Sequence, residues 1–331
     1  ATEGNLNNDI GVPLTLLRLN NEHAYAVIEM GANHPGEIAY LTGLARPDVA
    51  IINNAGPCHL EGFGDVAGVA RGKGEIFLGL NPDGVAVVNR DDPCAGYWAS
   101  LNPGRRIVDF GLDQPAAIDG RVLDPATNRF RLRAGGEEID VRLPVPGRHN
   151  VRNALAAAAA ALVAGATLDE VRRGLESLRG VDGRMQRLRG RHGGAVIHDA
   201  YNANPASLAA ALQAVGAGPG RKWLVLGDMR ELGPKADELH ARSGHEALAA
   251  GFERLYALGE HCRAAVAAFD GGGRHYAGVD ALIAELTGDL LLSGGEPPVV
   301  LVKGSRGMRM ERVVAALVAP EEPAANPEGH G

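Results

Sequence analysis

The sequence predicts an α/β protein with two domains, each built around a largely parallel β-sheet. Three observations support this prediction. The chain has 331 residues, which is the usual length of two domains. Short apolar runs alternate with helical segments along most of its length. Glycine is abundant while aromatic residues make up only 4% of the chain, and this composition suits tightly packed α/β layers.

The first part of the chain contains four short apolar runs that we expect to be strands. They are Tyr25–Ile28, Val49–Ile52, Val85–Val88 and Ile107–Phe110. The helical segments between them are Pro35–Leu44, Val66–Leu80 and Pro93–Leu101. Strands that alternate with helices indicate βαβ units and therefore parallel pairing. Pro35 suits the first position of its helix, and Asp65 can cap the next one.

The pattern changes between residues 119 and 143. Arg129–Arg133 and Glu138–Leu143 are short alternating runs separated by Gly135 and Gly136, which predicts a small antiparallel excursion. Two helices are expected after it, at Val151–Ala164 and at Leu168–Leu178, the second capped by Thr167. We place the end of the first domain at residue 180.

The alternation of strands and helices resumes after Gly183 and predicts a Rossmann-like second domain over residues 183–318. Its strands are expected at Ala195–His198, Trp223–Leu226, Leu255–Leu258 and Val299–Val302. Its helices are expected at Pro205–Val215, Ala236–Ala250, Ala264–Phe269, Asp280–Glu285 and Met308–Leu317. The remaining residues, 319–331, are rich in Pro, Glu and Gly, and we expect this tail to be disordered.

The bulk composition argues against several classes of protein. The formal charge is -7, and nothing indicates the basic face of a nucleic-acid-binding protein. The longest apolar run, Ala154–Val163, is far shorter than a membrane span, and no signal peptide is visible. The three cysteines form no CxxC pair, which argues against structural zinc and disulfides. We therefore expect a cytoplasmic protein that binds neither nucleic acid nor membranes.

Polar residues follow the predicted strands of the first domain. Glu29 ends the first run, His59 lies in the loop after the second, and Lys73 lies on the next helix. Open α/β sheets bind ligands at the carboxyl ends of their strands, and a carboxylate beside a basic group suits Mg²⁺ and phosphate. A solvated loop with an incidental histidine explains the same residues, and spacing alone does not separate the two interpretations.

Three loops of the second domain follow predicted strands in the same way. They are Asp199–Pro205, Asp228–Glu231 and Lys303–Arg306. A helix start beside Lys, Ser and Arg side chains can bind a carboxylate or a phosphate. The alternative for the first loop is an ordinary helix start with Asn204 as its cap. Three polar loops at one sheet edge favour a ligand site.

These segments resemble, in order and spacing, the Mur ligase family of ATP-dependent carboxylate–amine ligases. The matching segments are Gly4–Leu17, Val27–Asn33, His59–Phe63, Lys73–Phe77, Pro146–Asn150, Gly183-Arg184, Asp199–Pro205, Gly227–Met229 and Lys303–Arg306. Each is weak alone, and together they are specific. The resemblance runs from residue 1 to about residue 318. It implies a central nucleotide-binding domain with a parallel sheet, followed by a Rossmann-like C-terminal domain.

The resemblance also implies a reaction and its partners. ATP and Mg²⁺ would be used to join D-alanyl-D-alanine to UDP-N-acetylmuramoyl-tripeptide through an acyl phosphate, in peptidoglycan biosynthesis. The Gly4–Leu17 segment is typical of the family members that add this dipeptide. The full-length protein is expected to be a monomer.

In the first domain, the resemblance implies a metal site and a nucleotide site. Glu29 and His59 would hold Mg²⁺. Lys73 would carry a carbamate that helps to bind a second Mg²⁺; forming it requires a neutral amine, which burial favours. His149 and Asn150 would contact the nucleotide.

In the second domain, the resemblance implies contacts to both ATP and the incoming dipeptide. Arg184 and Asp199 would contact the phosphates and ribose of ATP. The residues expected to face the dipeptide are Asn202, Asn204, Ser305 and Arg306.

The sequence departs from the family pattern in one respect. Members carry a Gly-Lys-Thr phosphate loop and a uridine-nucleotide domain upstream of the segment matched by Gly4–Leu17, and this sequence contains neither. We therefore expect the central domain to be truncated, without its first strand, and the 331-residue chain alone not to ligate.

Two rival interpretations of the function remain. One is a sibling ligase for another amine, or for glutamate and folate, which Gly4–Leu17 argues against. The other is a non-catalytic binding module.

Overall fold

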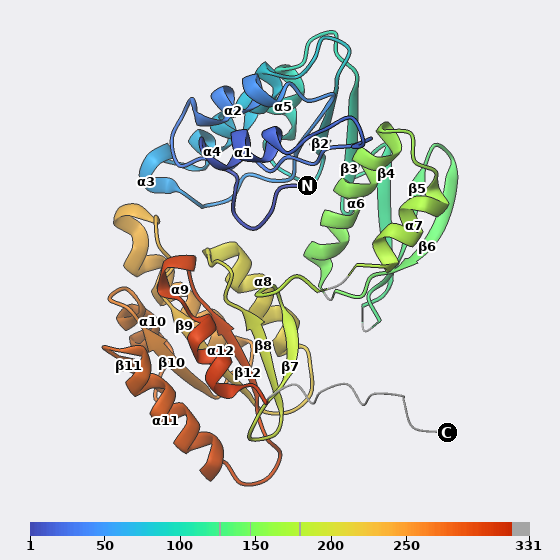
Figure 1. Ribbon diagram of the computed structural model, residues 1–331. Helices are drawn as coiled ribbons and strands as arrows, with labels where there is room; N and C mark the ends of the chain where they lie inside the picture. Colours follow the sequence, from blue (N-terminus) through green and yellow to red (C-terminus); the bar gives the residue numbers. More distant parts are fainter. Residues whose placement is uncertain (126, 146, 179, 320–331) are drawn as a thin grey trace, which may run out of the picture. The chain divides into compact units, whose positions relative to one another are not determined.

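The computed structural model describes residues 1–125, 127–145, 147–178 and 180–319 (Figure 1). The chain divides into two compact units, Ala1–Arg179 with Glu231–Gly233, and Gly180–Arg230 with Pro234–Gly331. Each unit contains a six-stranded sheet, and the predicted α/β class is confirmed. The disorder predicted for the tail concerns residues that, apart from Ala319, lie outside those described.

The sheet of the first unit follows the order of the chain. Its strands are β1 (Val49–Ile52), β2 (Val85–Asn89), β3 (Ile107–Gly111), β4 (Ile118–Asp124), β5 (Arg129–Ala134) and β6 (Glu137–Arg142). β1 to β4 pair in parallel, and β4, β5 and β6 pair antiparallel. The pairing of β5 with β6 confirms the predicted excursion, whereas β4 was not predicted. Gly135 and Gly136 join β5 to β6 with φ of +59° and +88°, a two-residue hairpin that favours glycine at both positions.

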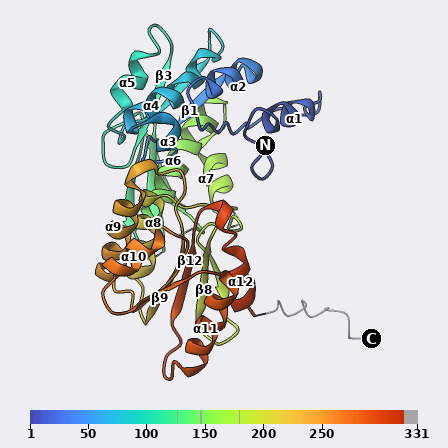
Figure 2. The same ribbon diagram turned by 90° about the vertical axis from the view of Figure 1, so that its left-hand side faces the viewer.

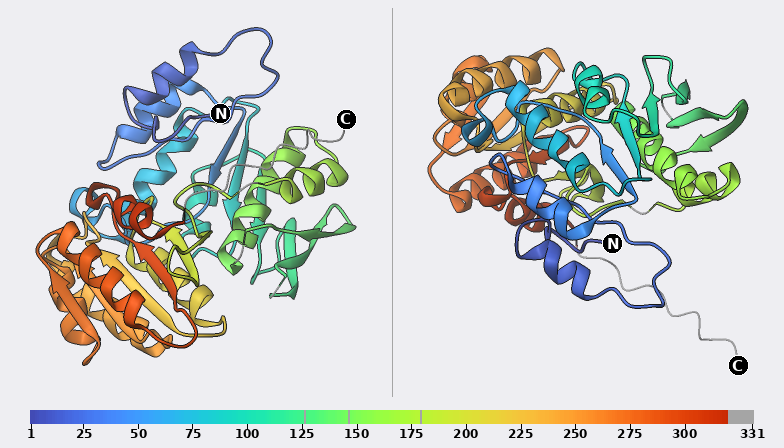
Figure 3. Two further views of the ribbon diagram at one scale, coloured as in Figure 1. Left: turned by 60° about the horizontal axis from the view of Figure 1, so that its bottom comes forward. Right: turned by 90° about the horizontal axis from the view of Figure 1, so that it is seen from above.

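Helices cover both faces of this sheet. The helices of this unit are α1 (Gly11–Leu17), α2 (Glu37–Ala45), α3 (Leu60–Phe63), α4 (Val66–Gly74) with the 3₁₀ turn η1 (Glu75–Leu78), α5 (Ala95–Ser100), α6 (Arg148–Val163) and α7 (Leu168–Glu176). Strand β2 shows how the faces are divided. Val85 and Val87 belong to the core formed with α6, whereas Ala86 and Val88 pack with Trp98 of α5. This alternation buries β2 on both sides. Helix α7 lies along β6 (Figure 3).

Two predictions for the N-terminal segment were wrong. Tyr25–Ile28 forms no regular strand, although Thr2 donates a backbone hydrogen bond to the carbonyl of Val27 at 2.9 Å. A strand requires a ladder of such bonds, and an apolar run does not reveal whether a neighbouring strand is available. Helix α2 begins at Glu37 rather than at Pro35, because Gly36 with a φ of +90° intervenes.

Helix α1 was not predicted. Its sequence contains Pro13, which usually breaks a helix. Here the proline lies in the first turn, where its missing N–H would have no partner within the helix. A proline near a helix start is therefore poor evidence against that helix.

The second unit contains a sheet whose order differs from the order of the chain. Its strands are β7 (Gln186–Arg189), β8 (Ala195–Asp199), β9 (Lys222–Gly227), β10 (Arg254–Leu258), β11 (Gly273–Tyr276) and β12 (Val299–Lys303), in the spatial order β11-β10-β9-β12-β8-β7. All neighbours are parallel except β7 and β8. The four predicted strands are confirmed. β7 and β11 were missed because both are half-exposed edge strands without an apolar run.

Helices lie on both sides of the second sheet, with α8, α9 and α10 on one side and α11 and α12 on the other (Figure 2). They are α8 (Pro205–Gly216), α9 (Ala236–Ala249), α10 (Cys262–Ala268), α11 (Val279–Leu292) and α12 (Glu311–Leu317), with 3₁₀ turns η2 (Gly233–Lys235) and η3 (Arg306–Met308). None of the helices in the described ranges is sufficiently long and apolar to span a membrane.

The helix caps predicted at Asp65 and Thr167 are confirmed, and so is the alternative interpretation of Asn204 as a helix cap. The Asp65 side chain accepts a hydrogen bond from the backbone of Gly68 at 2.6 Å. Thr167 and Asn204 each form a reciprocal capping box with the residue three positions later. Asn204 thereby fixes the start of α8 directly after the loop that follows β8.

Candidate functional site

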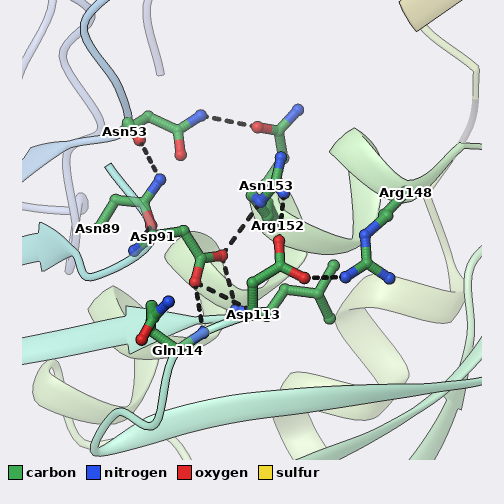
Figure 4. Close-up of polar contacts among 9 residues, drawn as sticks. Asn53, Asn89, Asp91, Asp113, Gln114, Arg148, Arg152 and Asn153 are labelled. Atoms are coloured by element: carbon green, nitrogen blue, oxygen red, sulfur yellow. Dashed lines mark hydrogen bonds and ion pairs between the residues drawn. The ribbon is translucent and has the colours of Figure 1, made fainter. Parts of the chain in front are cut away.

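In the first unit, a polar cluster joins the carboxyl ends of the strands to helix α6 (Figure 4). At its centre is Asp91, in the loop after β2, whose side chain is only 6% exposed. Its carboxylate accepts hydrogen bonds from the backbone N–H groups of Leu112, Asp113 and Gln114 at 2.8–2.9 Å. Arg152 of α6 adds a fourth bond from Nε at 3.1 Å. The loop after β3 and helix α6 are therefore tied to the same buried carboxylate.

Asp113 extends this cluster along the helix. Its carboxylate accepts a hydrogen bond from Arg152 at 2.6 Å and a second from Arg148. The bond from Arg152, followed by that from Arg148, holds the pKa of the Asp113 carboxyl below its usual value. Asp113 is therefore ionised at neutral pH, and its negative charge offsets the positive charges of both arginines at the start of α6.

Asparagine side chains connect the same helix to β1 and β2. Asn153 of α6 accepts a hydrogen bond from Asn53, the residue after β1, at 2.7 Å. Asn89 of β2 donates to the carbonyl of Asn53 at 2.8 Å. The residues predicted to contact the nucleotide, His149 and Asn150, lie in the first turn of α6, next to this cluster. The sequence did not identify Asp91 or Arg152, because only their spatial neighbours reveal their role.

The three predicted metal-site residues lie on separate elements of the first unit. Glu29 is exposed, and its carboxylate accepts a hydrogen bond from the side chain of Asn7 at 2.9 Å. His59 precedes α3 in the left-handed conformation, with a φ of 54°. Lys73 of α4 is half-buried, and its ammonium donates to the carbonyl of Asn54 at 2.7 Å. Their role in binding Mg²⁺ stays a prediction.

In the second unit, the loops after β8, β9 and β12 belong to three adjacent strands and are held together by buried polar contacts. The ammonium of Lys303, at the end of β12, is 2% exposed and donates to the Asp199 carboxylate at 2.6 Å. It also donates to the carbonyl of Asn202 at 3.0 Å. Burial lowers the pKa of Lys303, and the negative charge of Asp199 opposes that shift. This pair fixes the loop that carries Asp199 and Asn202.

Ser305 links the other two loops. Its hydroxyl accepts a hydrogen bond from the backbone of Arg230 at 2.9 Å and donates to the carbonyl of Ala203 at 3.3 Å. Its own N–H donates to the carbonyl of Asp228 at 3.1 Å. Arg306 differs from Ser305 because its side chain is 64% exposed and lies 3.7 Å from Glu311. A ligand could therefore compete for the Arg306 guanidinium at little cost.

Arg184 lies beside the loop after β8. Its guanidinium stacks over the ring of Tyr201 at 4.4 Å from the centroid, and the Tyr201 N–H donates to the carbonyl of Gly183 at 3.0 Å. The backbone of Met185 donates to Asp199 at 3.1 Å. Arg184 and Asp199, both predicted to contact ATP, are therefore neighbours within this unit. The contribution of Tyr201 was missed, although it belongs to the Asp199–Pro205 motif.

A buried group of Asp228, His240 and Cys262 has ligand atoms within 4.8 Å of one another, as a metal site would. Hydrogen bonds already explain its geometry. The Nε2 atom of His240 accepts from the backbone of Met229 at 2.9 Å, and Nδ1 donates to Ala236 at 2.7 Å. Asp228 accepts from the backbone of Cys262 at 2.8 Å, and burial raises the pKa of the Cys262 thiol. These hydrogen bonds hold the loop after β9 against α9 and α10.

The sequence matches two protein families that follow one another along the chain. The family described as "Mur ligase middle domain" matches residues 1–161, and "Mur ligase, glutamate ligase domain" matches residues 183–306.

Two similar proteins share one name, UDP-N-acetylmuramoyl-tripeptide--D-alanyl-D-alanine ligase. The protein of Escherichia coli (strain K12) is 45% identical over 320 residues, covering 96% of this chain and 70% of that protein. The protein of Bacillus subtilis (strain 168) is 33% identical over 325 residues, covering 96% and 69%.

Solved structures of similar proteins agree with this. MurF from Acinetobacter baumannii superimposes with a TM-score of 0.89 at 35% identity, over 95% of this chain and 69% of that one. MurF ligase from Thermotoga maritima in complex with ADP gives a TM-score of 0.80 at 26% identity, over 95% of this chain and 72% of that one.

The neutral state of His240 predicts a specific loss of stability in acid. Burial lowers its pKa, so the unfolded chain binds the proton first as the pH falls, and the contribution of His240 is complete only above its unfolded pKa. We expect His240→Gln, whose new side chain cannot titrate, to lower the free energy of unfolding by about 1 kcal/mol near pH 7.5. The difference in the free energy of unfolding between variant and parent should become smaller towards about pH 5, because only the parent loses stability as the histidine of its unfolded chain is protonated. Urea unfolding at several pH values measures this, and a constant difference would contradict it.

Proposed function

This chain belongs to the Mur ligase family, and on that premise we propose that it joins D-alanyl-D-alanine to UDP-N-acetylmuramoyl-tripeptide in peptidoglycan biosynthesis. The observation that carries the proposal is its identity to ligases of that name across nearly its whole length. The Gly4–Leu17 segment supports the dipeptide as substrate rather than another amine or glutamate.

The reaction has two chemical steps. The terminal carboxylate of the tripeptide attacks the γ-phosphorus of ATP, which forms an acyl phosphate and releases ADP. The amine of D-Ala-D-Ala then attacks the acyl carbon, loses a proton, and expels phosphate as the amide forms. Catalysis depends on positioning the reactants and on offsetting the charge of the transferring phosphoryl group.

The first unit would bind the nucleotide and the metal. His149 and Asn150 lie in the first turn of α6, beside the cluster around Asp91, and this tethering supports the prediction that they contact the nucleotide. Glu29 and His59 offer an oxygen and a nitrogen to Mg²⁺, which prefers oxygen. The hydrogen bond from Asn7 leaves the second oxygen of Glu29 to serve as a ligand. Bound Mg²⁺ would offset the negative charge of the phosphates.

Lys73 fits a metal site only if its amine is modified. An ammonium repels a cation, whereas a carbamate formed from the amine and CO₂ presents two oxygens and a negative charge. The contact with the carbonyl of Asn54 shows where the unmodified ammonium lies. We propose that the carbamate replaces this contact when Mg²⁺ is present.

The second unit would contribute contacts to ATP and to the dipeptide. Arg184 would approach the phosphates, with Tyr201 supporting its guanidinium, and Asp199 would contact the ribose. Ser305 and Asn202 lie in loops fixed by Lys303, which suits residues that position the dipeptide. The carbonyl oxygen of the Asn204 side chain serves the cap of α8, so only its amide nitrogen would be used for a substrate. We also propose a cytoplasmic monomer, and the three free cysteines suit a reducing compartment.

A coupled assay tests the proposed reaction in the complete polypeptide. Phosphate release from ATP should require both UDP-N-acetylmuramoyl-tripeptide and D-Ala-D-Ala. Omitting either substrate is the matched control. Release with glutamate and folate, but not with D-Ala-D-Ala, would identify a sibling ligase. Nucleotide binding without phosphate release, under every combination of substrates, would identify a binding module.

Substitution of Lys73 tests the carbamate. Lys73→Ala should lose most of the activity, and Lys73→Arg should not restore it, because a guanidinium cannot carry a carbamate. Short-chain carboxylates added to Lys73→Ala should restore part of the activity by supplying the missing oxygens. Arg71→Ala, on the same helix but exposed, is the control and should behave as the parent. Near-normal activity of Lys73→Arg would exclude the carbamate.

Substitution of Arg306 tests the dipeptide site. Its exposed guanidinium, at the start of η3, could bind the free carboxylate of D-Ala-D-Ala. We expect Arg306→Ala to raise the dipeptide KM about tenfold to a hundredfold, the usual effect of losing a charge-assisted contact. The KM for ATP should stay unchanged. Arg309→Ala provides a neighbouring control, and an equal effect on both KM values would reject the assignment.

A further inference from the structure

Helix α6 begins in an electrostatically unfavourable way. Its N-cap is Gly147, which has no side chain, and its first turn contains no acidic residue. Arg148 and Arg152 instead place two positive charges within the first two turns, where the helix dipole is already positive. Such a start requires negative charge from elsewhere in the fold to hold it in one position.

Two aspartates outside the helix provide that charge. Asp91 is buried, and its two oxygens accept four hydrogen bonds, which fill the acceptor capacity of a carboxylate. Three of those bonds come from the backbone after β3, so the position of Asp91 is fixed independently of α6. Arg152 bridges this fixed carboxylate, through Nε at 3.1 Å, and Asp113, at 2.6 Å (Figure 4).

Arg152 lies on the same part of α6 as the residues that are proposed to contact the nucleotide. Arg152 is three positions after His149, so their side chains are neighbours on the helix surface. Asn153, which contacts Asn150 at 3.4 Å, is bonded to Asn53 after β1. That second tether is neutral and therefore weaker than the bridge made by Arg152.

We propose that Arg152 is a positioning residue for nucleotide binding. It fixes the first turns of α6 against Asp91 and Asp113, so that His149 and Asn150 meet the nucleotide without first having to be ordered. This rests on the proposed function, in which His149 and Asn150 contact ATP. Arg152 itself does not touch the substrate. A lysine could not replace it fully, because a single ammonium cannot form the same two directed bonds.

Arg152→Met, measured in the complete polypeptide, removes both bonds and keeps most of the aliphatic stem. We expect the Kd for ADP, by calorimetry without other substrates, to rise about fivefold to tenfold, since about 1–1.4 kcal/mol of ordering is lost. The KM for ATP should rise similarly while the dipeptide KM is unchanged. The Kd for ADP of Arg152→Lys should lie between the values of the parent and of Arg152→Met. Asp113→Asn, at a half-exposed position, should raise the Kd for ADP less than Arg152→Met does.

Asp119→Asn is the matched control. It breaks a two-point pair between β4 and β5, with Arg133 at 2.7 and 2.9 Å, that involves no residue of α6, and it should leave the Kd for ADP unchanged. An unchanged Kd in Arg152→Met, with only a lower melting temperature, would overturn the proposal. Equal changes in the KM values of ATP and dipeptide would also overturn it.

His149→Ala and Asn150→Ala separate this proposal from the proposed function. If they weaken ADP binding while Arg152→Met does not, only the positioning role of Arg152 fails. If the parent does not bind ADP, or if neither alanine variant changes its Kd, the nucleotide site fails and the positioning role fails with it.

Discussion

A buried carboxylate must be compensated by hydrogen bonds or an opposite charge, and this requirement organises the polar edge of both sheets. In the first unit, Asp91 gathers the loop after β3 and the start of α6. In the second, Asp199 gathers the end of β12 and the backbone of Met185. Neither aspartate could be buried without these partners, because an ion without compensating bonds is expensive to remove from water. The loops that carry candidate ligand contacts are therefore held by the cost of leaving a charge unpaired.

The fold was largely predictable because the signals that define it are local. The strands with a continuous apolar run were found, and the caps at Asp65, Thr167 and Asn204 follow from the preference of short polar side chains for helix starts. Strand β4 was missed, because polar residues and a glycine separate Ile118 from Val122. Elements without a local signal were missed. β7 and β11 are polar edge strands, and the run Tyr25–Ile28 has the composition of a strand but no ladder of partners.

The candidate site was predictable only in part, and for a similar reason. Motifs next to strands indicated Asp199 and Ser305, and the resemblance to a family indicated His149. The contacts that hold those residues join distant parts of the chain: Lys303 is 104 positions from Asp199, and Arg152 is 61 positions from Asp91. No spacing rule links such positions, since the pairing depends on which strands become neighbours. Resemblance to a family supplied roles for residues, and the three-dimensional contacts supply the reasons why those residues stay in place.

The central position of β12 has a consequence for how the protein is made. This strand is the last of the second sheet in the sequence, yet it lies between β9 and β8. On the ribosome, β8 and β9 emerge while the strand that lies between them is still missing, and the edge of each that will face β12 stays unpaired until residues 299–303 arrive. The second unit therefore gains its cooperativity late in translation. A nascent chain that stalls before β12 would expose two unpaired strand edges, at which another chain could add a strand.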